Sequence, residues 1–233
     1  MSSDLIRAAR SSPLFAPAAR LAGAQVVLAL VKGLAPLSPR ERAPAAAGDP
    51  RLAHALVPEQ VSGAMLVVFA ALIPTLLVAY ATPPDGLRAA RVVALGEALA
   101  LAEAVTMILK AAAGRPRPIY YALIAEGSSE ARRSFPSGHS SCAAAGLGFA
   151  ALALGSAPRA HGRAVGLALA LAPSLLALWV GVTRIQDHWH WPTDVAAGLA
   201  IGSGAAAASF RRFAKGSKPL GDLAGNRGEP HLP

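Results

Sequence analysis

Charged residues are scarce in this sequence: Asp, Glu, Lys and Arg together make up 15% of its 233 residues, whereas a soluble domain carries about 25%. Hydrophobic residues make up 54%, and the mean hydropathy is +0.44. This composition excludes a disordered chain and argues against an ordinary soluble domain. The apolar residues stand in long continuous blocks, which is typical of membrane-spanning helices.

Cysteine and aromatic residues are also scarce. Cys142 is the only cysteine, which excludes an intrachain disulfide and a zinc site built from cysteines. Acidic residues are outnumbered by basic ones, 13 against 22. The net charge of +9 favours a nucleic acid, an anionic lipid or a phosphate-bearing substrate as partner. Because only 5% of residues are aromatic and no basic helix stands apart from the apolar blocks, we expect membrane lipids and a phosphate as partners and no nucleic acid.

Five apolar runs reach or nearly reach the length of about 20 residues that a membrane-spanning helix needs. They cover residues 60–84, 92–109, 140–158, 164–183 and 195–210. A sixth run, 15–34, is interrupted by Arg20 and Lys32. We therefore predict an all-α, polytopic membrane helix bundle of six transmembrane helices over residues 1–213, with a disordered tail at 214–233. Glu97 and Glu103 lie inside the second run, and we assign them no catalytic role.

The first motif follows the run 92–109 and reads Lys110-Ala-Ala-Ala-Gly-Arg-Pro-Arg117-Pro118. Its prolines predict the end of a helix. Arginine offers a planar fork and lysine a compact charge to the oxygens of a phosphate. Basic residues at a helix end also commonly extend to the membrane interface without binding a ligand, so Lys110 and Arg117 alone leave both interpretations open.

The second motif, Ser134-Phe-Pro136-Ser137-Gly138-His139, precedes the run 140–158 and predicts a turn followed by a helix N-terminus. Free N–H groups and the helix dipole favour an anion at such a position. Gly138 allows a ligand to approach the backbone, and Ser137 can donate a hydroxyl. An N-capping serine beside an incidental histidine is the alternative interpretation.

The third motif, residues 183–194, lies between the last two runs. His190 and Asp194 are four positions apart, so the carboxylate can accept an imidazole N–H, fix the tautomer and leave the other ring nitrogen free to attack. Arg184 supplies a second guanidinium. Two alternatives are an interfacial belt of Trp and His and a metal site built from His188, His190 and an aspartate.

The order of the runs places all three motifs on one side of the membrane. With six spans, the third predicted span ends at the first motif, and the fourth span begins at the second motif. The fourth span crosses the membrane and the fifth crosses back to the third motif. A phosphate site assembled from the three motifs is therefore favoured over any motif taken alone.

The motifs resemble, in order and in internal spacing, the three-part signature of the type 2 phosphatidic acid phosphatase superfamily, also called lipid phosphate phosphatases. The matching segments are Lys110-x6-Arg117-Pro118, Pro136-Ser137-Gly138-His139 and Arg184-x5-His190-x3-Asp194. Thr183 stands where the family usually has serine, and the hydroxyl is kept. The resemblance implies a membrane hydrolase of lipid phosphates, of the phosphatidate and diacylglycerol pyrophosphate class, that needs no metal or other cofactor.

The resemblance also implies the residue roles. His190 is the nucleophile that forms a phosphohistidine, and Asp194 orients it. His139 protonates the leaving alkoxide and then activates water. The residues that bind the phosphate oxygens are Lys110, Arg117, Ser137, Gly138 and Arg184.

The distribution of basic residues predicts the orientation. With six spans, eleven Lys and Arg lie on the side opposite the motifs, against six on the motif side once the three proposed phosphate ligands are set aside. The positive-inside rule then places the site on the non-cytoplasmic face of a multi-pass integral membrane protein. Three alternative functions remain: a polyprenyl diphosphate phosphatase, a vanadate-dependent haloperoxidase, whose soluble fold the apolar runs disfavour, and a non-catalytic lipid-binding protein, which the intact histidines disfavour.

Overall fold

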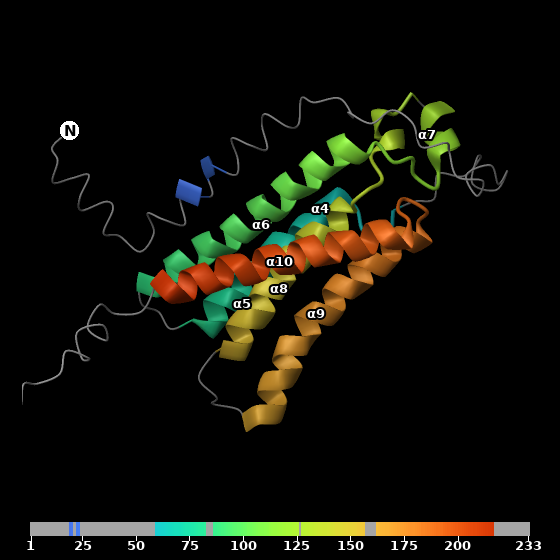
Figure 1. Cartoon of the computed structure of the whole chain (residues 1–233). Coiled ribbons are helices and arrows are strands. Elements are labelled where there is room, and N and C mark those ends of the chain that lie inside the picture. Colours follow the sequence, from blue (N-terminus) through green and yellow to red (C-terminus); the bar gives the residue numbers. More distant parts are fainter. Residues whose placement is uncertain are drawn as a thin grey trace, which may run out of the picture.

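The computed structural model describes residues 19–20, 22–23, 59–82, 86–125, 127–156 and 162–216. Within these ranges every regular element is helical, and the helices form one elongated bundle (Figure 1). The elements are α4 (Gly63–Val67), η2 (Val68–Leu72), α5 (Ile73–Ala81), α6 (Gly86–Ala113), α7 (Tyr120–Ala125), η3 (Ser129–Arg132), α8 (Gly138–Ser156), α9 (Gly162–Gln186) and α10 (Pro192–Gly216). α4 and α5 continue into each other through η2, a π-helical segment. The all-α bundle predicted from the sequence is therefore confirmed.

Each of the five apolar runs predicted as a span coincides largely with helix, and α6, α9 and α10 extend beyond their runs at both ends. α6 continues through Lys110 to Ala113 because glycine and proline, not charge, end it. Gly114 has a φ of +56°, and its N–H donates to the carbonyl of Lys110 at 3.2 Å, an ending that favours glycine. Pro116 follows at once and cannot continue the helix.

Three of these segments are long and apolar enough to cross a membrane: Gly63–Ala81, Leu87–Ala113 and Leu167–Gln186. Leucine and valine side chains on the outward faces of the first and third are exposed, as expected for surfaces against lipid; they include Val67, Leu76, Leu167 and Leu175. α8 and α10 contain more glycine, serine and alanine than these three segments. The count of six spans stays a prediction.

Two predictions concern segments that lie largely outside the described residues. Of the run 15–34, the structure describes residues 19–20 and 22–23 alone. Of the predicted tail at 214–233, it describes residues up to 216, and α10 runs to that point, beyond the predicted end of the helical domain at 213.

α8 is the central helix and contacts α5, α6, α9 and α10. Its contacts with two neighbours are so close that no side chain fits between the backbones. A Cβ on Gly202 of α10 would lie 2.1 Å from the carbonyl oxygen of Ser141, and a Cβ on Gly146 would lie 1.9 Å from that of Ala70 in η2. Such close contact is typical of small residues between membrane helices. It fixes the first turn of α8 against the middle of α10.

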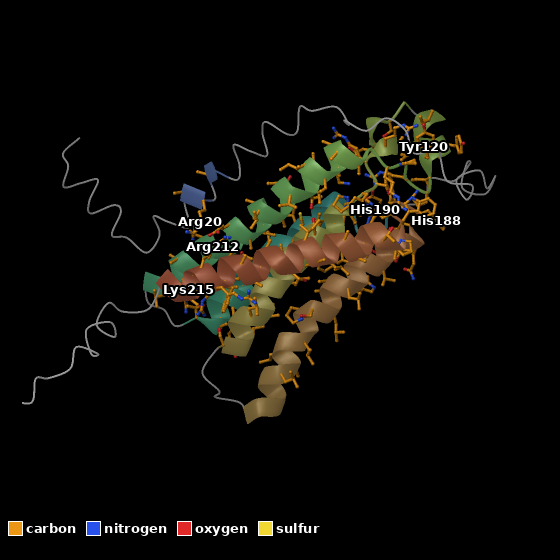
Figure 2. The ribbon with its side chains drawn as sticks, in the orientation of Figure 1. Arg20, Tyr120, His188, His190, Arg212 and Lys215 are labelled. Atoms are coloured by element: carbon orange, nitrogen blue, oxygen red, sulfur yellow. The ribbon has the colours of Figure 1, made fainter. Side chains whose placement is uncertain are left out.

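The other end of the bundle is joined by a buried carboxylate. Glu97 of α6 is 2% exposed and forms ion pairs with Arg212 of α10 at 2.8 Å and with Arg20 at 2.9 Å. Both arginines lie far from His190 in Figure 2. The ion pairs give Glu97 a structural role that links α6 to α10.

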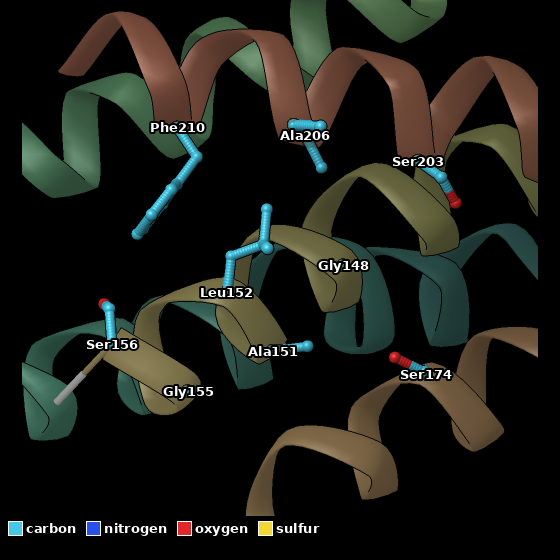
Figure 3. A pocket seen from close by; sticks show the side chains of 10 residues that line it. Gly148, Ala151, Leu152, Gly155, Ser156, Ser174, Ser203, Ala206 and Phe210 are labelled. Atoms are coloured by element: carbon cyan, nitrogen blue, oxygen red, sulfur yellow. The ribbon is translucent and has the colours of Figure 1, made fainter. Parts of the chain in front are cut away.

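A groove of about 560 Å³ opens between α8, α9 and α10, and it is lined mainly by small and apolar side chains (Figure 3). Its α8 residues run from Gly148 to Ser156, and its α10 residues from Ser203 to Phe210. The groove contains none of the motif residues.

Candidate active site

The residues of the three motifs meet at one end of the bundle. This end is formed by the C-terminal ends of α6 and α9 and the N-terminal ends of α8 and α10, with α7 and η3 beside them (Figures 1 and 2). Arg117 contacts His190 at 3.1 Å, which joins the first motif to the third. Ser134 donates a hydrogen bond to Asp194, which joins the second motif to the third. All eight residues singled out in the sequence lie in this region.

His190 lies in the tight connection between α9 and α10, where its backbone N–H donates to the carbonyl of Arg184 at 3.1 Å. Its side chain is buried, and its Nε2 lies 3.1 Å from Nη1 of Arg117. A guanidinium only donates hydrogen bonds, so Nε2 is the acceptor and the neutral ring carries its proton on Nδ1. Burial lowers the pKa of His190 to about 3, with Asp194 opposing and Arg117 and Lys110 reinforcing the shift. The ring is therefore neutral, with the Nε2 lone pair facing the cations.

Asp194 stands in the first turn of α10 and is completely buried. One carboxylate oxygen of Asp194, Oδ2, accepts hydrogen bonds from the hydroxyl of Ser134 and from the backbone N–H of Trp191, the latter at 3.0 Å. The other, Oδ1, pairs with Arg115 at 2.7 Å. Nδ1 of His190 lies 3.7 Å from Oδ2, which is longer than a hydrogen bond. His190 and Asp194 therefore lie close together as predicted, but the hydrogen bonds to Asp194 come from Arg115, Ser134 and Trp191.

His139 occupies the first turn of α8, just before the predicted span 140–158. Its Nε2 is buried and has no hydrogen-bond partner among the described residues. Burial lowers the pKa of His139 to about 3, and the charges of Arg184, Arg117 and Lys110 add to this effect. A neutral imidazole beside three cations is suited to accept a proton once an anion neutralises that charge.

Three buried cations surround this histidine. Lys110 donates to the carbonyl of Arg133. Arg117 donates through Nε to the carbonyl of Glu130 and through Nη2 to its carboxylate, both at 2.8 Å. Arg184, 1% exposed, donates to the carbonyl of Val61 at 3.0 Å, whereas its Nε has no hydrogen-bond partner among the described residues. These three side chains concentrate positive charge where a phosphate would be held.

The start of α8 completes this cluster. The hydroxyl of Ser137 accepts from the backbone N–H of Ser140 at 3.4 Å, a weak N-cap, and from its hydroxyl at 2.9 Å. A Cβ on Gly138 would have Lys110 Cε as its nearest neighbour, at 3.9 Å. Packing therefore does not require glycine at 138, and its absent side chain leaves space between Lys110 and the first N–H groups of the helix, which have no intrahelical acceptor.

Sequence reasoning missed several residues that hold these side chains. Glu130 binds Arg117, and Glu59 pairs with Arg184 at 3.3 Å. Ser134 and Arg115 both bind Asp194. Arg115 and Ser134 stand within or beside the motifs, where their polar side chains were a signal, whereas nothing in the sequence connects Glu59 or Glu130 to its arginine.

The described residues do not form the metal site that the third motif offered as an alternative. His188 is exposed and has a φ of +59°. Over the described ranges, no three side chains among His, Cys, Asp and Glu come close enough together to hold a metal ion.

Comparisons with known proteins find relatives that each match less than half of the chain. Lipid phosphate phosphatase 1 of Arabidopsis thaliana is 36% identical over 131 residues, covering 47% of this chain and 40% of the relative. A protein named probable diacylglycerol pyrophosphate phosphatase 1 of Schizosaccharomyces pombe is 30% identical over 131 residues, covering 46% of this chain and 47% of the relative. Lipid A 1-phosphatase of Rhizobium johnstonii is 37% identical over 102 residues, covering 41% of this chain and 37% of the relative.

In each case the chain spans less than half the length of the curated relative that it matches. No solved structure matches the chain significantly. The sequence model of the PAP2 superfamily matches residues 91–217, a range that contains most of α6, all of α8, α9 and α10, and every motif residue. The chain therefore belongs to the PAP2 superfamily.

Proposed function

We propose that this protein hydrolyses lipid phosphate monoesters or diphosphates, of the phosphatidate and diacylglycerol pyrophosphate class, through a phosphohistidine at His190. The observation that carries the proposal is the buried Nε2 of His190, an unprotonated acceptor 3.1 Å from Arg117, beside a second histidine whose Nε2 has no partner among the described residues. The names of the relatives support a lipid phosphate as substrate.

The reaction proceeds in two balanced steps. Lys110, Arg117 and Arg184 bind the phosphate oxygens, and Nε2 of His190 bonds to phosphorus as the P–O bond to the lipid breaks. His139, protonated in the complex, gives its proton to the leaving oxygen. His139 then takes a proton from water, whose oxygen bonds to phosphorus as the P–N bond breaks and inorganic phosphate leaves.

Asp194 stabilises the positive charge that develops on His190 in the first step. Its carboxylate lies on the Nδ1 side of the ring, opposite the attacking nitrogen. In this scheme the three cationic side chains supply the charge that stabilises the equatorial oxygens of the transition state, so the proposed reaction needs no metal ion.

The proposed setting is a multi-pass membrane protein with its site at the non-cytoplasmic face. α8 and α10 are then spans as well, and their glycine- and alanine-rich sequences suit helices that pack against other helices instead of lipid. The exposed apolar faces of α5 and α9 support the same arrangement.

The test is phosphate release from a panel of substrates in detergent micelles with EDTA present. The panel contains phosphatidate, lysophosphatidate, diacylglycerol pyrophosphate, a polyprenyl diphosphate and a water-soluble phosphate monoester. We expect the first and third to be the best substrates, with no loss in EDTA and no turnover by His190→Ala. Preference for the polyprenyl diphosphate would overturn the proposed substrate class. Loss of activity in EDTA that Mg²⁺ or Zn²⁺ restores would overturn the metal-free mechanism.

A further inference from the structure

The side chain of Arg115 joins the segment after α6 to the start of α10. Its Nη1 lies 2.7 Å from Oδ1 of Asp194 and 2.7 Å from the hydroxyl of Thr193. Its guanidinium also lies over the ring of Trp191, 5.7 Å from the centroid. Asp194 is completely buried, so this arginine is the cation in direct contact with a carboxylate that water does not reach.

The backbone around Arg115 strengthens the same connection. Its carbonyl accepts from the N–H of Ser134 at 3.0 Å, and Ser134 donates its hydroxyl to Oδ2 of Asp194. The carbonyl of Pro116 accepts from the indole N–H of Trp191 at 3.0 Å. The segment 115–116 therefore holds both the carboxylate and the tryptophan that precedes α10.

We propose that Arg115 is a positioning residue: it keeps Asp194 ionised and oriented behind His190, while the phosphate is bound by other side chains. This inference rests on the function proposed above. Arg115 binds Asp194 directly and also contacts Thr193 and Trp191 beside it, so we infer that it acts through Asp194. A buried carboxylate without a partner cation favours its protonated form, which cannot stabilise an imidazolium.

Three charged side chains and the neutral ring of His190 face Asp194. Arg115 is in direct contact, His190 lies 3.7 Å away, and Lys110 and Arg117 act from a greater distance. Burial raises the pKa of Asp194, but the contacts with His190, Ser134 and Trp191 and the charge of Arg115 outweigh it and lower the pKa below its usual range. Removal of Arg115 removes the closest full positive charge from this balance.

The experiment is a double-mutant cycle of Arg115→Met, Asp194→Asn and the double variant, with phosphatidate in micelles. We expect Arg115→Met to lower kcat by about 10²-fold, the scale of a misplaced reacting group, with little change in KM because the phosphate ligands are untouched. We expect the double variant to be no slower than Asp194→Asn, because both changes act through the same carboxylate. Additive losses would overturn the proposal.

Two further variants separate positioning from folding. Arg115→Lys keeps the positive charge and should recover most of kcat, whereas Arg211→Met, an exposed arginine on α10, should behave as wild type. A loss with Arg115→Lys equal to that with Arg115→Met would contradict the charge argument. A raised KM with unchanged kcat would instead make Arg115 a phosphate ligand.

A readout without turnover keeps the inference separate from the proposed function. Infrared difference spectra of Arg115→Met should show a protonated carboxyl at neutral pH that is missing in wild type and in the double variant. Absence of that band would overturn the inference even in an active enzyme. A wild-type protein that releases no phosphate from any lipid, yet shows the band in Arg115→Met, would refute the proposed function and leave the role of Arg115 toward Asp194 standing.

Discussion

Arg117 donates a hydrogen bond to His190, with Nη1 lying 3.1 Å from Nε2. Nε2 is the atom proposed to attack phosphorus, so its lone pair is engaged while the site is empty. The hydrogen bond therefore occupies both the lone pair of the proposed nucleophile and one N–H of the proposed phosphate ligand. A bound phosphate has to take this N–H from the histidine before the lone pair is free.

The two histidines should respond differently to removal. His190→Ala should abolish turnover and any covalent intermediate. His139→Ala should lose about 10² to 10⁴-fold, the usual contribution of general acid catalysis, and the loss should be larger for phosphatidate than for a substrate with a good leaving group such as a nitrophenyl phosphate. Each variant is assayed for turnover of both substrates and for an acid-labile phosphoenzyme that can be trapped. Equal losses of His139→Ala on both substrates would contradict its role as general acid. A phosphoenzyme in His190→Ala would contradict the role of His190 as nucleophile.

Glu130 competes with a phosphate for Arg117, because its carboxylate accepts from Nη2 at 2.8 Å. Glu130→Gln should tighten inhibition by inorganic phosphate by about two- to fivefold, the range expected for a partly exposed ion pair. Glu130→Asp, which keeps the charge, is the matched control and should stay near wild type. Weaker inhibition in Glu130→Gln would mean that the carboxylate orients Arg117 for the phosphate instead of competing with it.

The pH dependence of kcat/KM should follow the ionisation of the substrate phosphate and not that of a histidine with an ordinary pKa. Both pKa values lie at about 3, so His190 and His139 are neutral in the free enzyme above about pH 4. The proton that the leaving group needs must then enter with the monoanionic phosphate, whose second pKa is about 6. We expect kcat/KM on a phosphate monoester to be flat between about pH 4 and 6 and to fall about tenfold per unit above that.

This profile is measured with samples returned to pH 6 after exposure to each pH, which separates titration from unfolding. A decrease of kcat/KM as the pH falls from 6.5 to 5 would show that the nucleophile has an ordinary histidine pKa, in conflict with its burial.

The contact between α8 and α10 can be tested with two glycines of one helix. A Cβ on Gly202 would lie 2.1 Å from the carbonyl of Ser141, whereas a Cβ on Gly204 has nothing within 4 Å. Gly202→Ala should destabilise the protein by about 1 to 3 kcal/mol, the usual cost of overpacking, and should lower activity because His139 and Asp194 stand at the ends of these helices. Gly204→Ala should be neutral or slightly stabilising. Equal unfolding temperatures in detergent for both variants would contradict this packing.

The sequence predicted the five central helices because each contains an apolar run bounded by charges, glycine or proline. It also predicted that Lys110, His139 and His190 share one end of the bundle, since counting crossings needs no knowledge of packing. Helix ends were less predictable. Lys110 and Arg212 continue their helices past the apolar runs, because charged side chains are good helix formers and do not end a helix.

What the sequence could not give were contacts between distant segments. Glu59 reaches Arg184, and Glu130 reaches Arg117, through loop conformations that no spacing rule describes. The hydrogen bond between His190 and Asp194 was predicted from a four-residue separation alone. The structure places them at 3.7 Å because Arg115, Ser134 and the Trp191 backbone already hold the carboxylate.

The position of Glu97 has a consequence for how the protein is made. Its partners come from both directions along the chain: Arg20 precedes it, and Arg212 lies in the last helix that the structure describes. Synthesis proceeds from the N-terminus, so Arg20 is present when Glu97 reaches the membrane, whereas Arg212 arrives only after four further helices have been made. A lone carboxylate inside a span is costly. Arg20 is therefore the cation that can pair with Glu97 during that interval, and Arg212 can join the pair only once α10 has been made.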